Sequence, residues 1–209
     1  MKHILITNDD GYDSLGLLAL IESVRPLGRV TVVAPATEKS ACGHSLTLTR
    51  PLRFLGVDDD FYKLDDGTPS DCVYLALHSL FEEQKPDLVI SGINKGSNMG
   101  EDITYSGTAS AAMEAVLHGI PAIAFSQVTH YTDTKAPEFD FTLASSIAHT
   151  LVKKVLEGGF PLETRLFLNV NIPNISPHEC QGIKTTRVGY RHYGNDAHRH
   201  KNPRGEEHY

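Results

Sequence analysis

Asp9 and Asp10 stand side by side after a short apolar run, in the sequence Asn-Asp-Asp-Gly at residues 8–11. Two adjacent carboxylates repel each other unless a positive group lies beside them, and hard divalent cations such as Mg²⁺ take carboxylate oxygens as ligands. Asp and Asn also cap tight turns without any other role. The residue types therefore allow either a metal site or a simple turn.

A second conspicuous stretch covers residues 92–108, where glycines are mixed with small polar side chains. Glycine lets backbone N–H groups approach a ligand closely, and a helix N-terminus adds partial positive charge. Ser106, Gly107 and Thr108 open a predicted helix, so we expect them to bind an anion. The stretch matches neither the dinucleotide-binding glycine pattern nor the phosphate loop that ends in Gly-Lys-Ser/Thr. An ordinary turn-rich loop is the alternative.

These residues need a scaffold that brings their loops together, and the chain alternates strand and helix patterns. The predicted strands are residues 3–7, 29–35, 87–91, 121–126, 165–173 and 182–188. The predicted helices are residues 15–28, 68–81, 107–119 and 141–159. Residues 45–65 break the alternation and predict a β-hairpin inserted beside the main sheet. The order predicts an α/β fold with a doubly wound, mainly parallel, Rossmann-like sheet.

In such a sheet, ligands bind beyond the carboxyl ends of the strands, where the strand order reverses. The loops that carry the acidic pair, Ser40 and Asn94 all leave strands at that edge. Ser40 and Asn94 offer neutral oxygens that could complete a metal site with Asp9 and Asp10. This placement favours a metal site over turn chemistry.

Residues 1–189 are expected to form a single domain, and residues 190–209 the start of a C-terminal arm or loop. The latter segment is polar and rich in His and turn residues. His192, His198 and His200 could ligate a metal, but a solvated loop is the favoured interpretation.

The composition excludes several classes of function. The 209-residue chain has a net charge of −7 with its 11 His neutral, which argues against binding to nucleic-acid duplexes or anionic membranes. A phosphate-bearing substrate would then need a local positive group such as a metal ion. The three scattered Cys fit neither a disulfide framework nor a zinc pattern, and no apolar stretch reaches the length of a membrane span. We expect a cytoplasmic protein.

Five segments, in order, resemble the motifs of the SurE family of metal-dependent nucleotidases, also called survival proteins. They are ILITNDDG, VAPATEKSACGHSLT, GTPSDCV, KPDLVISGINKGSNMGEDITYSGTASAAMEA and NVNIP. The resemblance runs from residue 3 to about residue 173 and continues more weakly through residues 186–193.

The resemblance implies an α/β phosphatase domain that hydrolyses nucleoside 5′- and 3′-monophosphates. It implies one divalent cation per subunit, Mg²⁺ or Mn²⁺, held by Asp9, Asp10, Ser40 and Asn94. Family members usually continue beyond the position of Tyr209 into a segment used in dimer and tetramer contacts. We therefore expect a homodimer or homotetramer, and a C-terminal arm that this sequence truncates.

Catalysis is assigned to Asp9, Asp10 and Asn94. Substrate contacts are assigned to a set of loop residues, namely Asn8, Asn98, Ser106, Gly107 and Thr108. Asn8 has an equally good interpretation as a turn residue. Tyr105 is either a stacking surface or a packing residue, and His44 is a weak candidate for a proton donor.

Three other classes of protein share some of these features. A phosphoacceptor receiver domain needs an Asp where its third strand ends, and this chain has Ser91 there. A haloacid-dehalogenase-type phosphatase needs two Asp separated by one residue, which residues 8–11 lack. A nucleotide-binding module without catalysis stays open, and a metal-dependence assay distinguishes it from the enzyme.

Overall fold

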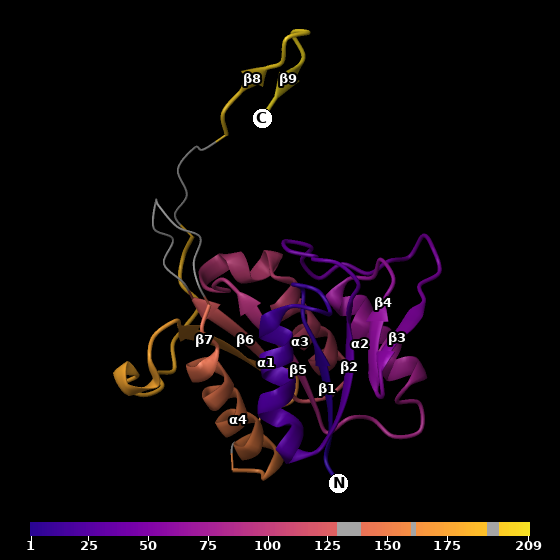
Figure 1. Ribbon diagram of the computed structural model, residues 1–209, viewed down its shortest axis with the longest axis vertical. Helices are drawn as coiled ribbons and strands as arrows, with labels where there is room; N and C mark the ends of the chain where they lie inside the picture. Colours follow the sequence, from indigo (N-terminus) through magenta and orange to yellow (C-terminus); the bar gives the residue numbers. More distant parts are fainter. Residues whose placement is uncertain (129–138, 160–161, 192–196) are drawn as a thin grey trace.

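The computed structural model describes residues 1–128, 139–159, 162–191 and 197–209. A seven-stranded sheet lies at its centre, with helices on both faces (Figure 1). The strands are β1 (His3–Thr7), β2 (Arg29–Pro35), β3 (Phe54–Asp58), β4 (Phe61–Leu64), β5 (Leu88–Lys95), β6 (Ala122–Val128) and β7 (Phe167–Pro173). Their order across the sheet is β3-β4-β2-β1-β5-β6-β7, and only the pairing of β3 with β4 is antiparallel. The predicted doubly wound α/β fold is confirmed.

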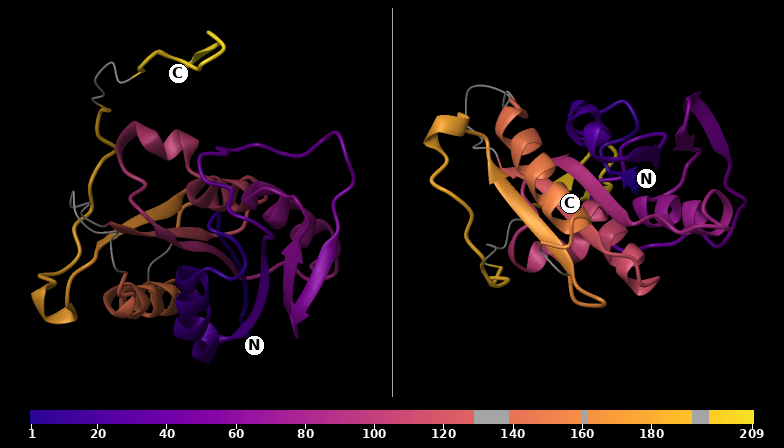
Figure 2. Two further views of the ribbon diagram at one scale, coloured as in Figure 1. Left: turned by 45° about the horizontal axis from the view of Figure 1, so that its top comes forward. Right: turned by 90° about the horizontal axis from the view of Figure 1, so that it is seen from below.

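Two layers of helices bury the two faces of the sheet (Figures 1 and 2). The helices are α1 (Leu15–Val24), α2 (Pro69–Ser79), α3 (Gly107–Leu117) and α4 (Thr142–Leu156), with short 3₁₀ turns η1 (Arg25–Leu27), η2 (Gly100–Tyr105) and η3 (Pro177–Glu179). The apolar sides of α1 and α4 pack on one face of the sheet, and those of α2 and α3 on the other. Alternate residues of β1 serve the two cores: Ile4 and Ile6 point into the first, and Leu5 into the second.

β1 is the point where the strand order reverses. It pairs in parallel with β2 on one side and with β5 on the other, so that Thr7 at its end lies opposite Ser91. The loops that leave β1 and β5 therefore begin side by side, at the place where open α/β sheets bind ligands.

Capping side chains fix where the helices begin. Ser14, Thr68 and Ser106 each accept a backbone N–H of the first turn of α1, α2 and α3, respectively. At Thr68 the cap is reciprocal, because Asp71 in turn accepts the backbone N–H of Thr68. Pro69 follows this cap at the first position of α2, where its missing N–H costs no helical hydrogen bond.

The structure differs from the sequence-based predictions in four places. The inserted hairpin is confirmed as β3–β4, but it extends the edge of the sheet because β4 pairs with β2, and residues 45–53 are not a strand. β5 continues past Gly92 to Lys95, so the glycine-rich loop is shorter than predicted. Residues 182–188 are exposed and form no strand. A small hairpin, β8 (His200–Lys201) with β9 (Glu207–His208), was not predicted, and Figure 1 shows it well separated from the sheet.

Within the described residues, no helix has the length and apolar character needed to cross a membrane. The longest, α4, has 15 residues.

Candidate active site

Asp9 is held firmly by the N-terminus of α3. Its carboxylate, 4% exposed, accepts the Thr108 hydroxyl at Oδ1 over 2.5 Å and the Thr108 N–H at Oδ2 over 3.1 Å. Burial raises the pKa of Asp9, and the bonds from Thr108 oppose that rise. The positive end of α3 is therefore directed at a carboxylate of the chain itself.

Gly107, the first residue of α3, lies directly against Asp9. A Cβ at this position would come within 2.8 Å of the Asp9 Cβ and 2.9 Å of the Cys42 sulfur. Burial raises the pKa of the Cys42 thiol to about 11, so this neighbour is neutral at physiological pH. Glycine is needed here because a side chain would displace Asp9 or Cys42.

Asp10 adds a second, partly desolvated carboxylate. Its Oδ2 accepts the N–H of Lys95 over 3.0 Å. Burial raises the pKa of Asp10 to about 6, and the neighbouring Asp9 adds to the rise. Neither carboxylate forms a salt bridge with a Lys, Arg or His among the residues that the structure describes. The pair therefore carries unfavourable negative charge that a cation would relieve.

The two neutral candidates come from the neighbouring loops. Asn94, on β5, donates through Nδ2 to the carbonyl of Gly96 over 3.0 Å, which leaves its amide oxygen as an acceptor. Ser40 is exposed and donates to Glu38 over 2.7 Å, so its oxygen retains lone pairs. Lys39 ties this loop to the acidic pair, because its N–H donates to the Asp9 carbonyl over 2.7 Å.

Comparison with known proteins identifies the family. A sequence model of the family described as "Survival protein SurE" matches residues 4–195. The chain belongs to the SurE family. The resemblance predicted from the five motifs is confirmed.

Several relatives align with this SurE-family chain over most of their own length. A protein called 5'-nucleotidase SurE from Wolinella succinogenes is 66% identical over 210 residues, which cover 100% of this chain and 80% of the relative. A protein of the same name from Sulfurovum sp. (strain NBC37-1) is 65% identical over 209 residues, covering 100% and 79%. The crystal structure of a SurE protein from Aquifex aeolicus superposes with a TM-score of 0.86 at 48% identity, covering 99% of this chain and 80% of that one.

The donor set of this SurE-family chain fits a hard divalent cation. Among the described residues, no three His, Cys, Asp or Glu side chains gather as a metal-binding group. The predicted set has two carboxylates and two neutral oxygens, which suits Mg²⁺ or Mn²⁺ because such ions bind oxygen and keep other positions for water and substrate. The two carboxylates, which form no salt bridge with a described residue, provide the negative charge that the cation would neutralise.

The other predicted substrate residues lie around this set with their groups partly engaged. Ser106 caps α3 by accepting the Ala109 N–H over 3.0 Å, and its hydroxyl proton forms no bond with a described residue. Both donors of Thr108 are taken by Asp9. Asn8 donates to the Gly11 carbonyl and the Ser14 hydroxyl, each over 2.8 Å, so it closes the turn that presents the acidic pair.

Lys39 and Tyr105, which flank the site in the sequence, each have a defined partner. The Lys39 ammonium pairs with Asp66 over 2.8 Å. The Tyr105 ring is 54% exposed, with the Arg191 guanidinium 5.2 Å from its centre. His198 and His200 are exposed in the outlying segment, and His192 falls outside the described residues.

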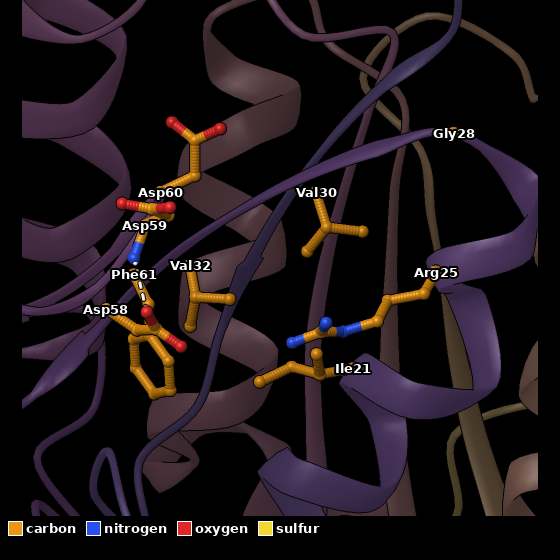
Figure 3. Close-up of a pocket in the computed structure, with 9 residues that line it drawn as sticks. All are labelled: Ile21, Arg25, Gly28, Val30, Val32, Asp58, Asp59, Asp60 and Phe61. Atoms are coloured by element: carbon orange, nitrogen blue, oxygen red, sulfur yellow. Dashed lines mark hydrogen bonds between the residues drawn. The ribbon is translucent and has the colours of Figure 1, made fainter.

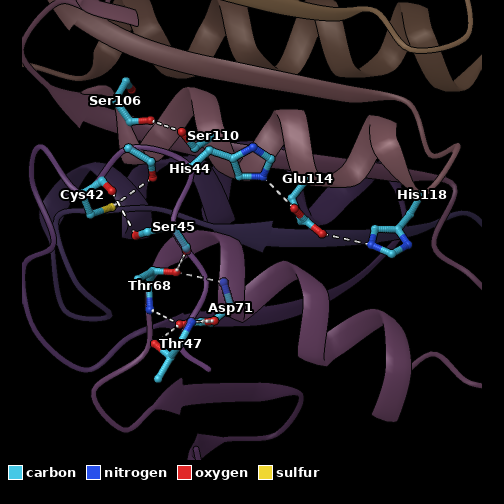
Figure 4. Close-up of polar contacts among 11 residues, drawn as sticks. Cys42, His44, Ser45, Thr47, Thr68, Asp71, Ser106, Ser110, Glu114 and His118 are labelled. Carbon is cyan, nitrogen blue, oxygen red and sulfur yellow. Dashed lines mark hydrogen bonds and ion pairs between the residues drawn. The ribbon is translucent and has the colours of Figure 1, made fainter. Parts of the chain in front are cut away.

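Two groups that the sequence did not single out lie next to the site. Glu114, buried on α3, accepts from His44 over 2.6 Å and from His118 over 3.0 Å (Figure 4). Asn169 and Asn171 on β7 hold the backbone of Asn98. Two features of the sequence could have identified these residues: Glu114 is an acid within a helix of small residues, and Asn169 and Asn171 occupy alternate positions of a strand.

Two cavities in the described part of the chain lie away from the acidic pair. One, of about 170 Å³, is lined by Arg25, Gly28 and the turn at residues 58–60 among others, at the end of the sheet where β1 and β2 begin (Figure 3). Another, of about 330 Å³, lies between residues 46–52 and α2. Neither of these two cavities is lined by a predicted metal ligand.

Proposed function

We propose that this chain is a phosphomonoesterase that hydrolyses nucleoside 5′-monophosphates, and also 3′-monophosphates, to nucleoside and inorganic phosphate. The observation that carries the proposal is the acidic pair, which is desolvated, forms no salt bridge with a described residue, and lies where an α/β sheet binds ligands. Relatives named 5'-nucleotidase SurE, at 65% and 66% identity over the whole chain, support the nucleotide as substrate.

Asp9, Asp10, Ser40 and Asn94 would hold one Mg²⁺ or Mn²⁺ ion per subunit. When bound, such an ion neutralises phosphate charge and activates water or a leaving oxygen as a Lewis acid. Thr108 keeps the Asp9 carboxylate oriented through its two bonds. The turn closed by Asn8 holds Asp9 and Asp10 together at the end of β1.

The remaining side chains would meet the phosphate. Asn94, Asn98, Ser106 and the backbone at Gly107 line the path of the chain from β5 into α3, and their donors suit oxygens that carry negative charge. Donors fixed before the reaction stabilise the transition state most, because they need no reorganisation as charge shifts among the phosphoryl oxygens. In one route Asp9 or Asp10 would accept a proton from the water that attacks phosphorus, while the P–O bond to the nucleoside breaks and the nucleoside oxygen takes up a proton. In the other route the carboxylate would attack phosphorus and release the protonated nucleoside, and water would then hydrolyse the acyl phosphate to inorganic phosphate and the free carboxylate.

The decisive experiment measures release of inorganic phosphate across a panel of nucleoside 5′- and 3′-monophosphates. EDTA should abolish release, and Mn²⁺ or Mg²⁺ should restore it. Asp9→Asn and Asp10→Asn should each lower turnover by orders of magnitude, whereas Asp59→Asn, in the exposed β3–β4 turn, serves as the matched control. Full activity in EDTA would refute the metal, and nucleotide binding without release would identify a non-catalytic binding module.

A cytoplasmic location and a homodimer or homotetramer stay predictions. Light scattering of the purified protein measures the second directly.

A further inference from the structure

A row of polar side chains crosses three neighbouring strands beside the site. Asn94 on β5 is in register with Ser126 on β6, and Ser126 with Asn171 on β7. Residues in register on parallel neighbours point to the same face of the sheet. The predicted ligand Asn94 is therefore the first member of a row that continues into two strands without predicted ligands.

The chain folds back over this row at Asn98, four residues after Asn94. The Asn98 side chain donates to the Ser126 hydroxyl over 2.7 Å. Its backbone N–H donates to the Asn171 amide oxygen over 2.9 Å, and its carbonyl accepts the Asn171 amide N–H over 3.0 Å. One asparagine side chain thus holds both backbone groups of Asn98, as a neighbouring strand would.

Asn169, one pleat earlier on β7, adds a third bond to the backbone of Asn98. Its amide N–H donates to the same carbonyl over 2.8 Å, and its amide oxygen is buried without a partner in the described part of the chain. In all, four hydrogen bonds converge on Asn98 from β6 and β7.

Burial makes these bonds effective. Ser126 is fully buried and Asn98 is 8% exposed, so an unpaired polar group here would pay the cost of lost hydration. The segment between Asn94 and η2 turns at Gly96, which adopts positive φ and whose N–H donates to the Gln127 carbonyl over 3.0 Å. The four bonds at Asn98 fix the part of the segment that leads from Gly96 to η2.

We propose that Ser126 and Asn171 are positioning residues for the reaction: they fix Asn98, and with it the loop that joins the ligand Asn94 to the N-terminus of α3. Their consequence for catalysis depends on the proposed phosphatase function, whereas their effect on the loop does not. Neither residue is expected to touch the substrate.

The test combines amide hydrogen exchange with kinetics for Ser126→Ala, Asn171→Ala and Asn171→Asp. Asn171→Asp keeps an acceptor for the Asn98 N–H but sets a second carboxylate oxygen against the Asn98 carbonyl. Ser70→Ala is the matched control, because Ser70 is also fully buried and its hydroxyl has no partner among the described residues. Exchange is followed in peptides covering residues 94–105 and, for comparison, in β1 and β2.

Both Asn171 variants should exchange faster in residues 94–105 only, with β1 and β2 unchanged. At saturating Mn²⁺, they should raise KM for a nucleoside monophosphate by about tenfold, as expected for the loss of one or two hydrogen bonds. Ser126→Ala should give a smaller shift in the same direction, and Ser70→Ala none.

Wild-type exchange and wild-type KM in folded Asn171→Ala and Ser126→Ala would overturn the proposal. So would faster exchange throughout the sheet with KM unchanged, because that pattern marks a purely structural role. Should the wild-type protein release no phosphate from any nucleotide, the proposed function fails, and the exchange data still decide whether the row holds the loop.

Discussion

Replacement of Gly107 by alanine tests the site more sharply than removal of a ligand, because the change adds one methyl group and removes no polar atom. The new Cβ would lie 2.8 Å from the Asp9 Cβ, about 0.6 Å short of ordinary contact at 3.4 Å. Overpacking of this kind costs about 1 to 3 kcal/mol, and the higher helix propensity of alanine returns up to about 1 kcal/mol. We therefore expect a net loss of about 1 to 2 kcal/mol, or roughly 2 to 8 °C in Tm for a chain of this size.

The effect on turnover should be larger than this small loss of stability suggests. A displacement of about 0.6 Å exceeds the tolerance of about 0.5 Å for a preorganised site, and a misplacement of about 1 Å costs about a hundredfold in rate. We expect kcat/KM to fall between about tenfold and a hundredfold, with a higher Mn²⁺ concentration for half-maximal activity.

The assay is a Mn²⁺ titration of phosphate release, with calorimetry on the same samples. Gly56→Ala is the matched control, because no atom lies within 4 Å of its added Cβ. The double variant Gly107→Ala/Cys42→Ala removes the 2.9 Å contact with the Cys42 sulfur and leaves the 2.8 Å contact with the Asp9 Cβ. Wild-type kinetics in Gly107→Ala, or full recovery in the double variant, would refute the argument that Gly107 sets the position of Asp9.

Three more outcomes follow from the packing, the caps and the burial of the site. Gly16→Ala should destabilise the protein by about 3 kcal/mol, although alanine favours helices, because its Cβ would lie 2.0 Å from the Ile93 carbonyl oxygen; a gain of stability in urea unfolding would contradict this packing. Thr68→Ala removes the cap of α2 and a bond to the Ser45 carbonyl, so calorimetry should show a loss of about 1 to 2 kcal/mol while turnover is nearly unchanged; an unaltered Tm would count against the cap. In chelator, Asp10 should make the free energy of unfolding decrease as the pH rises from about 4 to about 6. The pKa of Asp10 is about 6 in the folded state and about 3.9 in the unfolded chain, so between these values the folded state keeps a proton that the unfolded chain has released. This contribution to stability is lost as the pH passes the folded pKa. Asp10→Asn should remove that part of the slope, and an unchanged slope would mean that Asp10 is not desolvated.

Local signals carried most of the fold. The helix after Thr68 could be predicted because a cap, a proline and an acid all lie within four residues, and each acts on its own neighbourhood. Residues 182–188 show the limit of such signals. Their composition favours a strand, but a strand forms only with a partner, and this segment is exposed and unpaired in the described structure.

Long-range pairing decided what the sequence could not. Gly92 predicted the start of a loop, yet β5 continues because Asn94 and Lys95 pair with Ser126 and Gln127 of β6. The acidic pair and Gly107 could be assigned to one edge of the sheet because the loops that carry them leave parallel strands at their carboxyl ends. The contact between Thr108 and Asp9 could not be predicted, because these residues are 99 positions apart in the sequence. The alternate spacing of Asn169 and Asn171 on β7 indicates that both side chains point to one face of the sheet. Nothing in the sequence indicates that their partner is the backbone of Asn98.

The alanine-rich side of α3 limits how this protein can be redesigned. Ala111, Ala112 and Ala115 are fully buried against the sheet and α2, so the helix lies as close to its support as a side chain allows. A larger residue at any of these positions would lift the helix, and Thr108 would move with it relative to Asp9. A library that varies this buried side should therefore lose activity before it loses folded protein. Substitutions with larger residues should be better tolerated on the outer side of α3, where Leu117 is half exposed.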